Sequence, residues 1–271
     1  MTLRVLHPAP ARGAGTGTLV EADRVVGADP VVEAGTVVEA GTDEGRARLR
    51  ELYAPPAADW LRLNLIAAVS GDAAGEDGTS DTLSNADDRA VLAAIRDLAD
   101  GVLVGAASVR AEGYRVPRSA QLVVLTASGD LSGHRMDPDR ADRVVVVCPA
   151  AAVDRVTETL GVDVAARATV LVVDDDHGVV APATLVDRLR GHGLRSLVCE
   201  GGPSLAGQLL HDGLVDELCL STSPVVIGSG LPVFGRERFD PSRLSLSQLM
   251  MDDQSALYAR WLVADGPATR R

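Results

Sequence analysis

The sequence predicts an α/β fold with a mostly parallel sheet, helices on both faces and antiparallel strands at the C-terminal end. From about residue 59 onward, apolar runs rich in Val, Leu and Ile alternate with segments of helical periodicity. This alternation is typical of parallel sheets that are covered on both faces. The last three apolar runs have no helical segment between them, which favours antiparallel pairing, since parallel strands need a longer crossover.

Residues 1–42 differ from the rest of the chain. They are rich in Gly, Ala, Val and Pro, and VVEAGT occurs twice in tandem at 31–36 and 37–42. Two copies are too few for a stacked-repeat fold, so we expect a flexible or irregular N-terminal segment. Residues 43–53 predict a short charged helix that Pro55 and Pro56 end, with a linker to 58. We expect one compact domain over 59–265 and a tail over 266–271.

Within the expected domain, the first strand covers 61–69. Ser84 or Asn85 would cap a helix whose apolar residues recur at helical spacing, and Gly101 would end it. Strands are expected next at 102–105, 122–126, 144–148 and 170–173. A helix at 182–190, a strand at 196–199 and a helix from Pro203 to Gly213 follow. The late strands are expected at 218–226, 244–250 and 257–263.

Composition excludes several classes of protein. The chain has 271 residues, 46% hydrophobic and 24% charged, which is ordinary for a soluble globular protein. Its net charge of −12 argues against binding to nucleic acid or to an anionic membrane surface. All 26 basic residues are Arg, so chemistry that needs Lys is excluded. No apolar run approaches the roughly 18 residues of a membrane helix, and we expect a cytoplasmic protein.

The cysteines favour buried, reduced thiols. Cys148, Cys199 and Cys219 are widely spaced and lie in apolar runs. No metal-binding spacing is present, and the histidine and cysteine signature of zinc deaminases is absent. We therefore expect no metal site.

The strongest candidate site is the turn from Glu200 to Leu205. Two glycines, Gly201 and Gly202, follow an apolar strand and precede a helix that begins with Pro203. Glycines allow close approach of a ligand to the backbone, and a helix N-terminus suits a pyrophosphate. A plain tight turn is the alternative. A hydrolase is disfavoured, because G-x-S-x-x-G over 202–207 is one residue longer than the nucleophile elbow.

Two further features are weaker. The strand ending at Gly105 leads into a second turn of small residues, but no G-x-G-x-x-G fingerprint follows any strand. Asn64 interrupts an apolar run. A buried Asn needs partners, so Asn64 either contacts a ligand or satisfies the backbone.

Three segments, 62–78, 82–114 and 197–228, together resemble the C-terminal reductase domain of the bifunctional riboflavin-biosynthesis deaminase/reductase, the RibD C-terminal family. The most specific part is E-G-G-x-x-L at 200–205 followed by G-L-V-D-E-L at 213–218. R-x-E-G-Y at 110–114 is similar to a stand-alone actinobacterial branch of pyrimidine-reductase-like proteins. The resemblance covers roughly residues 60–264 and implies a dihydrofolate-reductase-like fold. Without a zinc-deaminase motif, only the reductase half is expected.

The resemblance implies an NADPH-dependent homodimer that transfers hydride to the ribosyl C1′ of 5-amino-6-(5-phosphoribosylamino)uracil. It also suggests a cis peptide between Gly201 and Gly202. Thr126 and Ser128 lie where this fold usually holds the 2′-phosphate of the cofactor. The implied cofactor-binding residues are Gly105, Ala106, Ser108, Thr126, Ser128, Gly201, Gly202, Pro203, Ser204 and Leu205.

On the substrate side, the resemblance implies Asn64, Ser84, Arg96, Glu112 and Glu200. Arg96 could hold a phosphate with its fork, or be a solvated arginine on a helix face. The acid that protonates the substrate could be Glu112, Glu200 or a water molecule.

The chain departs from the family on this side. Ser70 stands where the family has an Asp. The segment 112–118 replaces the family's D-D-P-x-L-T-x-R, and no Arg of this chain aligns with the Arg that ends that pattern. Arg115 or Arg118 could substitute. Two alternatives therefore stay open: a reductase of a dihydropterin or dihydrofolate-like heterocycle, and a non-catalytic NADP(H)-binding paralogue.

Overall fold

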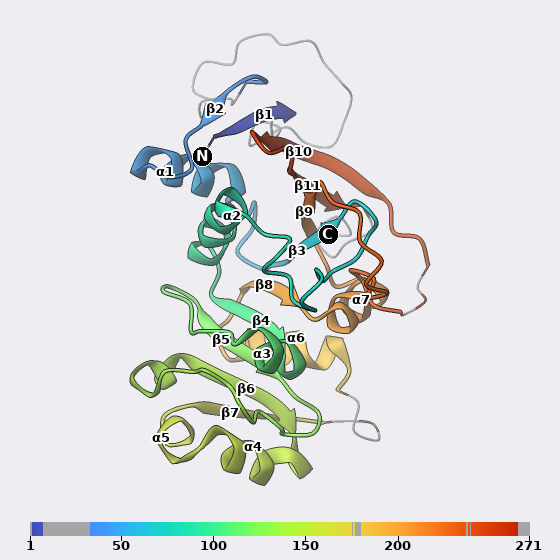
Figure 1. Ribbon diagram of the computed structural model, residues 1–271. Coiled ribbons are helices and arrows are strands. Elements are labelled where there is room, and N and C mark those ends of the chain that lie inside the picture. Colours follow the sequence, from blue (N-terminus) through green and yellow to red (C-terminus); the bar gives the residue numbers. More distant parts are fainter. Residues whose placement is uncertain are drawn as a thin grey trace.

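The computed structural model describes residues 2–7, 33–174, 176, 180–236, 238 and 240–264. In this part the chain builds an 11-stranded sheet in the order β2-β1-β10-β11-β9-β3-β8-β4-β5-β6-β7 (Figure 1). The strands from β9 to β7 in this order are parallel. The strands β11, β10, β1 and β2 continue the sheet with antiparallel pairing. The predicted fold class is therefore confirmed.

The strands are β1 (Leu3–His7), β2 (Val37–Val38), β3 (Trp60–Ala68), β4 (Gly101–Gly105), β5 (Gln121–Leu125), β6 (Val144–Pro149), β7 (Thr169–Val173), β8 (Ser196–Gly201), β9 (Glu217–Ser223), β10 (Leu244–Asp252) and β11 (Leu257–Val263). The helices are α1 (Asp43–Tyr53), α2 (Ala86–Asp97), α3 (Ala106–Glu112), α4 (Val153–Leu160), α5 (Val162–Ala165), α6 (Pro182–Gly191) and α7 (Pro203–His211), with short 3-10 turns at Pro138–Arg143 and Ala150–Ala152.

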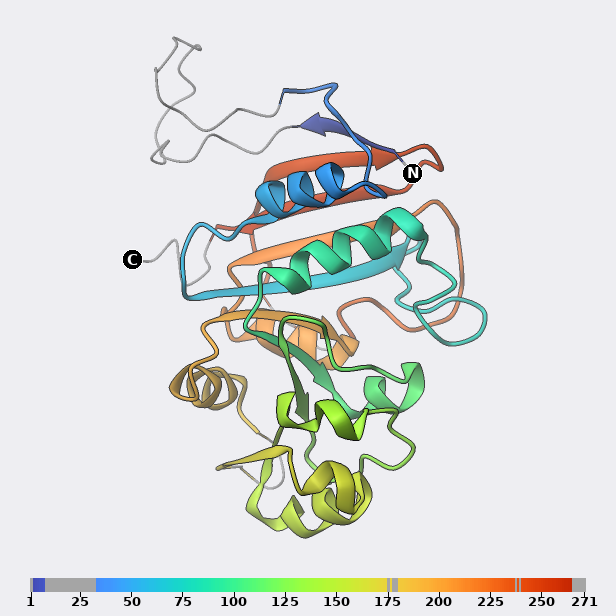
Figure 2. The same cartoon turned by 90° about the vertical axis from the view of Figure 1, so that its left-hand side faces the viewer.

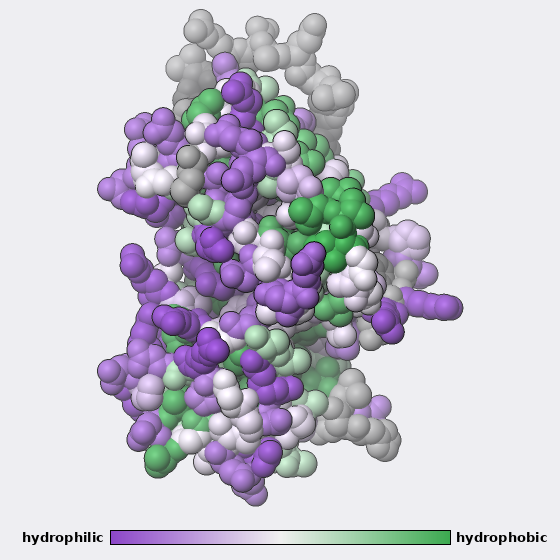
Figure 3. Space-filling model, viewed as in Figure 1, coloured by the Kyte–Doolittle hydropathy of each residue, from purple (hydrophilic) through white to green (hydrophobic). Residues whose placement is uncertain are grey.

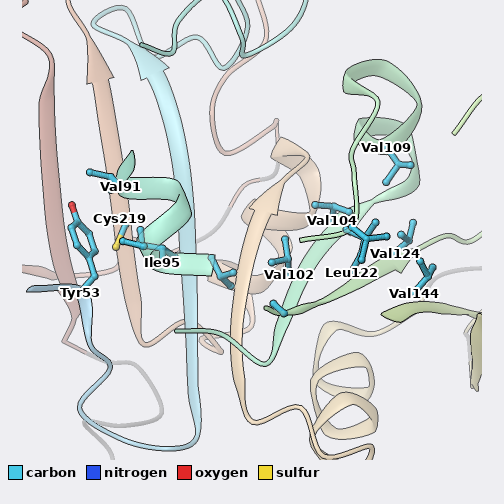
Figure 4. Packing of buried hydrophobic residues seen from close by; sticks show 14 of the residues in the cluster. Tyr53, Val91, Ile95, Val102, Val104, Val109, Leu122, Val124, Val144 and Cys219 are labelled. Atoms are coloured by element: carbon cyan, nitrogen blue, oxygen red, sulfur yellow. The ribbon is translucent and has the colours of Figure 1, made fainter. Parts of the chain in front are cut away.

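Hydrophobic layers cover both faces of the sheet. Successive side chains of a strand point to opposite faces, so Val102 and Val104 join one layer and Leu103 joins the other. The first layer includes residues of α1 to α5, and the second includes residues of α6 and α7. Figure 2 shows α1 and α2 lying across one face of the sheet. Figure 4 shows side chains of the first layer packed against the central strands.

Several predicted boundaries are confirmed. The helix at 43–53 and the strand at 257–263 begin and end at the predicted residues. Asn85, not Ser84, caps α2, because its side chain accepts hydrogen bonds from the backbone N–H groups of Asp87 and Asp88. The strand predicted at 218–226 is shorter, since β9 ends at Ser223.

The prediction of an irregular N-terminal segment is wrong for residues 3–7 and 37–38. Strand β1 pairs with β10, and β2 pairs with β1. Leu3, Val5 and Val38 are buried in the first hydrophobic layer, so the packed structure begins well before residue 59. The strands escaped prediction because they are short and the partner of β1 lies far away in the sequence. Residues 8–32 and 266–271 lie outside the described residues.

Helices α3, α4 and α5 were also missing from the prediction. Helix α3 has seven residues and α5 has four, too short for a hydrophobic period to show clearly. Helix α4 has eight residues, and its buried side chains are Val156 and Leu160. These short helices cover the sheet near β5 and β6.

Candidate active site

A cavity of about 1690 Å³ lies at the carboxyl ends of β3, β8, β4 and β5. Ligands of open α/β sheets bind at this edge. Every residue that the sequence analysis assigned to the site lines this one cavity: Asn64, Ser84, Gly105, Ala106, Ser108, Arg96, Glu112, Thr126, Ser128, Glu200, Gly201, Gly202, Pro203, Ser204 and Leu205. Their individual roles remain predictions.

The turn between β8 and α7 contains a cis peptide between Gly201 and Gly202, as the family resemblance suggested. Gly201 has a φ of 120°, a conformation that favours glycine. Pro203 begins α7, and no side chain caps this N-terminus. Because Gly202, Pro203 and Ser204 line the cavity, the positive end of the helix dipole is available to an anion there.

The turn between β4 and α3 lies against this first turn, because β4 and β8 are neighbours in the sheet. A Cβ added to Gly202 would lie 3.0 Å from the Ser108 Oγ atom, and one added to Gly105 would lie 3.7 Å from the Gly202 nitrogen. A side chain at Gly202 would therefore crowd Ser108, whereas a Cβ at Gly105 would make an ordinary contact. The two turns form a narrow cradle with little side-chain bulk.

The turn after β5 forms the next part of the cavity wall. The buried Thr126 hydroxyl accepts a hydrogen bond from the Gly129 N–H at 3.0 Å, and the Ser128 hydroxyl accepts one from the Asp130 N–H at 3.3 Å. Gly129 has a φ of 76°, and a Cβ there would lie 2.5 Å from the Ala152 carbonyl oxygen. The glycine is therefore required for this turn.

At the other end of the cavity, Arg96 on α2 pairs with Glu200 at the end of β8. The Arg96 Nε and Nη2 atoms donate to the two Glu200 oxygens at 2.7 and 2.6 Å. Glu200 has only 3% of its side chain exposed and Arg96 has 27%. Burial alone would lower the pKa of Arg96, but the Glu200 carboxylate outweighs it and raises that pKa. The Arg96 fork therefore holds a carboxylate of the protein.

Glu112 and Tyr114 lie beside this pair. Desolvation by the cavity walls raises the pKa of Glu112, the Ser80 hydroxyl at 3.3 Å opposes this, and the Glu200 charge adds to it. The Tyr114 ring lies 5.9 Å from the Arg96 Cζ atom, a cation–π distance. Burial and the two glutamates raise the pKa of the Tyr114 hydroxyl.

Sequence reasoning missed several cavity residues. Asp88 accepts a hydrogen bond from the predicted Ser84 at 2.8 Å, and desolvation raises the pKa of Asp88. In the sequence, Asp88 reads as an ordinary acid in the first turn of a helix. Tyr114 belongs to the R-x-E-G-Y segment, but the sequence pattern alone assigned it no role. Leu231 and Val233 reach the cavity from the loop after β9, and nothing in the local pattern indicates this.

The described part of the chain contains no group of three side chains spaced to hold a metal ion. No helix in that part combines the length and apolar character needed to cross a membrane.

A sheet that is parallel at its centre and antiparallel at one end, with glycine-rich turns around a cavity, defines a dihydrofolate-reductase-like fold. Comparison with known families gives a more specific assignment. The RibD C-terminal domain family matches residues 59–258, and the chain belongs to this family.

Relatives agree with this assignment. The chain is 28% identical over 179 residues to a 2,5-diamino-6-ribosylamino-4(3H)-pyrimidinone 5′-phosphate reductase of Methanothermobacter thermautotrophicus, a match over 62% of this chain and 79% of that protein. A pyrimidine reductase-like protein from Corynebacterium diphtheriae has a similar structure, with a TM-score of 0.68, 24% identity, and coverage of 79% of this chain and 98% of that one.

A diaminohydroxyphosphoribosylaminopyrimidine deaminase/5-amino-6-(5-phosphoribosylamino)uracil reductase from Thermotoga maritima is also similar. Its TM-score is 0.62 at 19% identity, over 75% of this chain and 56% of that one. The similarity thus covers about half of that bifunctional protein.

Proposed function

We propose that this chain is an NADPH-dependent reductase of the riboflavin-biosynthesis type, which transfers hydride to the ribosyl C1′ of 5-amino-6-(5-phosphoribosylamino)uracil. Family membership and the reductase names of its relatives support this proposal. The observation that carries it is the cavity itself, in which both glycine-rich turns and the Arg96–Glu200 pair share one space.

The residues present fit a dinucleotide. The N-terminus of α7 has no side-chain cap, so its free N–H groups would hold the pyrophosphate. Gly105 and Gly202 line the cavity without side chains, so the cofactor could approach the backbone closely there. NADPH, when bound, supplies the hydride. The chain's own part is to orient the two reactants and exclude water.

On the substrate side, Arg96 fixes the orientation of Glu200, whose carboxylate would accept hydrogen bonds from the substrate. The C1′=N bond of the ring-opened ribosylamine takes the hydride at carbon and needs a proton at nitrogen. Glu112 would provide that proton, because its raised pKa keeps it protonated at higher pH than an ordinary glutamate.

The substrate phosphate needs a cation other than Arg96, whose fork is taken. Arg115 and Arg118 line the cavity on the segment after Tyr114. This segment lies beside the end of α2, where the Ser119 hydroxyl donates to Asp97 at 2.8 Å. We infer that one or both of these arginines hold the phosphate.

Turnover by the purified chain tests the proposal. We expect NADPH to raise the melting temperature, and NADPH absorbance to fall only when the ribosylaminouracil phosphate is added. If NADPH binds but is oxidised only when a dihydropterin or dihydrofolate is added, the chain would be a reductase of such a heterocycle. The Arg96 fork supports this alternative, because it is bound to Glu200 and not free for a substrate phosphate. Binding without oxidation by any of these would favour a non-catalytic paralogue. Failure to bind NADPH would contradict all three.

The assembly and location of the protein also remain proposals. A cytoplasmic homodimer is what the resemblance implies. The edge of β10 is paired with β1, so a second copy would need another surface. Val69, Val225, Val226 and Leu231 are exposed on two adjoining loops, and Figure 3 shows a hydrophobic area over these loops. Mass measurement in solution, with Val226→Asp as the variant, tests this surface.

A further inference from the structure

The sheet order gives the cavity two chemically different ends. From β8, one direction leads to β3 and the other to β4 and β5. The β3 end holds Asn64, Glu200 and the Arg96 fork, while the β5 end holds Thr126 and Ser128. Under the proposed function, on which this inference rests, a pyrophosphate at α7 would place the nicotinamide toward β3. The adenosine half of the cofactor would then lie toward β5.

One arginine of the cavity wall is tied to the β5 end. Arg110 is exposed on the last turn of α3, and its Nη1 atom donates a hydrogen bond to the backbone carbonyl of Asp130. The Asp130 carbonyl belongs to the turn that contains Ser128. This contact holds the guanidinium against the turn. Within the described ranges, the Nε and Nη2 atoms of Arg110 have no hydrogen-bond acceptor, so they are left for a ligand.

The other arginines of the cavity wall have positions elsewhere. Arg96 is bound to Glu200, and Arg89 pairs with Asp81 at 3.2 Å. Arg46 lies on α1 and pairs with Asp43. Arg115 and Arg118 belong to the segment beside the end of α2. Among the cavity arginines that the structure describes, Arg110 is therefore the cation at the β5 end.

Among the described residues, no carboxylate accepts a hydrogen bond from Arg110, although the Asp130 carboxylate is close enough to feel its charge. Arg110 donates to the neutral carbonyl of Asp130, whose carboxylate accepts from the Ser132 N–H at 3.1 Å. In a protein of net charge −12, a phosphomonoester needs a local cation to be attracted rather than repelled. Guanidinium is the group best suited to phosphate, because its donors form a fork.

We propose that Arg110 is the residue that selects NADPH over NADH, by binding the ribose 2′-phosphate together with the Ser128 hydroxyl. Ser128 accepts the Asp130 N–H and still has its own proton to donate. NADH lacks the 2′-phosphate, so it gains nothing from Arg110. The two cofactors should therefore respond differently to a change at this position.

Arg155 provides a matched control. It is an exposed arginine on α4 and pairs with Glu158 at 3.0 Å. Like that of Arg110, its positive charge helps to lower the pKa of Asp130. It does not line the cavity. Arg155→Gln removes the same charge from the neighbourhood of the same turn. It therefore separates direct phosphate binding from a general change in the field.

The experiment compares Arg110→Gln, Arg110→Lys and Arg155→Gln with the unchanged chain. Dissociation constants are measured by calorimetry for NADPH and NADH, and for 2′,5′-ADP and 5′-AMP, which differ by the 2′-phosphate alone. For Arg110→Gln we expect NADPH and 2′,5′-ADP to bind about 10- to 100-fold more weakly. We expect NADH and 5′-AMP to change by less than about twofold. Arg110→Lys should recover part of the loss, and Arg155→Gln should change none of the four.

Three results would overturn the inference. Equal losses for NADPH and NADH in Arg110→Gln would mean that Arg110 only holds the turn in place. A preserved preference for NADPH in that variant would mean that another group binds the phosphate. If Arg155→Gln weakened NADPH binding as much as Arg110→Gln, the general electrostatic field, and not direct contact with Arg110, would determine the preference for NADPH. If the unchanged chain bound neither dinucleotide, the proposed function itself would fail, a result distinct from the other three.

Discussion

Two glutamates bound by arginine lie on the strands that flank β3, and they differ in their access to solvent. Glu200 on β8 has one arginine, Arg96, which is 27% exposed and lines the cavity. Glu217 on β9 has no exposed side-chain surface and binds both Arg62 and Arg260. The Trp60 indole N–H also donates to Glu217 at 2.8 Å.

The sealed cluster of Glu217, Arg62 and Arg260 fastens a helix to the sheet. Arg62 Nη2 donates to the Tyr53 carbonyl at 2.7 Å, and Arg260 donates to the Leu52 carbonyl. These carbonyls end α1, where backbone acceptors lack partners within the helix and the dipole is negative.

The comparison shows that the residue types of an Arg–Glu pair do not reveal its role, whereas its access to solvent does. Both glutamates accept short, charge-assisted hydrogen bonds. The acceptors of Glu217 are all engaged by the protein and closed from solvent, so its role is structural. The Arg96–Glu200 pair faces an open cavity, where a ligand can reach it.

The largest expected effect is the loss of stability in Glu217→Gln. Removing the carboxylate leaves two buried guanidinium groups without their counter-charge, which costs about 3–5 kcal/mol. Glu200→Gln should cost less, about 1–2 kcal/mol, since water can reach the partly exposed Arg96. Urea unfolding of both variants measures this difference. Equal losses would contradict the division between the two pairs.

Acid should weaken the sealed cluster in a defined range. Burial alone would raise the pKa of Glu217, but Arg62 and Arg260 outweigh it and lower that pKa to about 2, from 4.5. A folded-state pKa below the unfolded value means that the stabilisation is present above pH 4.5 and is lost as pH falls toward 2. The unfolding free energy of Glu217→Gln should fall less steeply across this range. Parallel slopes for variant and unchanged chain would contradict the assignment.

Activity should depend instead on the groups around the open pair. Glu112→Gln is expected to lower kcat about 100-fold, the usual contribution of a general acid. Because the pKa of Glu112 is raised, kcat should fall as pH rises through that value, and this limb should disappear in the variant. A limb that persists in Glu112→Gln would assign the proton to another group.

The smallest expected effect comes from replacing one arginine of each Arg–Glu pair by lysine. Arg96→Lys removes the fork that orients Glu200 and should lower kcat/KM about tenfold with little loss of stability. Arg62→Lys should lower stability and leave kcat/KM nearly unchanged. Steady-state kinetics and urea unfolding on both variants test this. Loss of activity in Arg62→Lys at a temperature where it is fully folded would contradict the comparison.

Much of the fold could be predicted because its signals are local. The β8–α7 turn occupies consecutive residues, and the family pattern extends over the same stretch, so Glu200 to Leu205 were assigned together. The central strands are continuous Val and Leu runs. By contrast, β1 is five residues long and pairs with β10, and no local pattern reveals a partner so distant in sequence.

The sequence was enough to predict which residues line the site, but not which of them contact one another. Residues inherited from the family pattern all line the cavity. The pairing of Arg96 with Glu200 spans 104 residues, and each residue alone is compatible with a phosphate, a substrate or solvent. The Glu217 cluster joins β9, β3 and β11, and its members look like ordinary polar residues within strands. Only the folded sheet brings such residues together.

The most direct test of the central claim follows a deuterium atom. The purified chain is given NADPH deuterated at both C4 positions together with the ribosylaminouracil phosphate, and the product is analysed by mass spectrometry and NMR. The account predicts one deuterium at C1′ of the ribityl product. Cofactor binding without transfer, or deuterium at any other carbon, would contradict it.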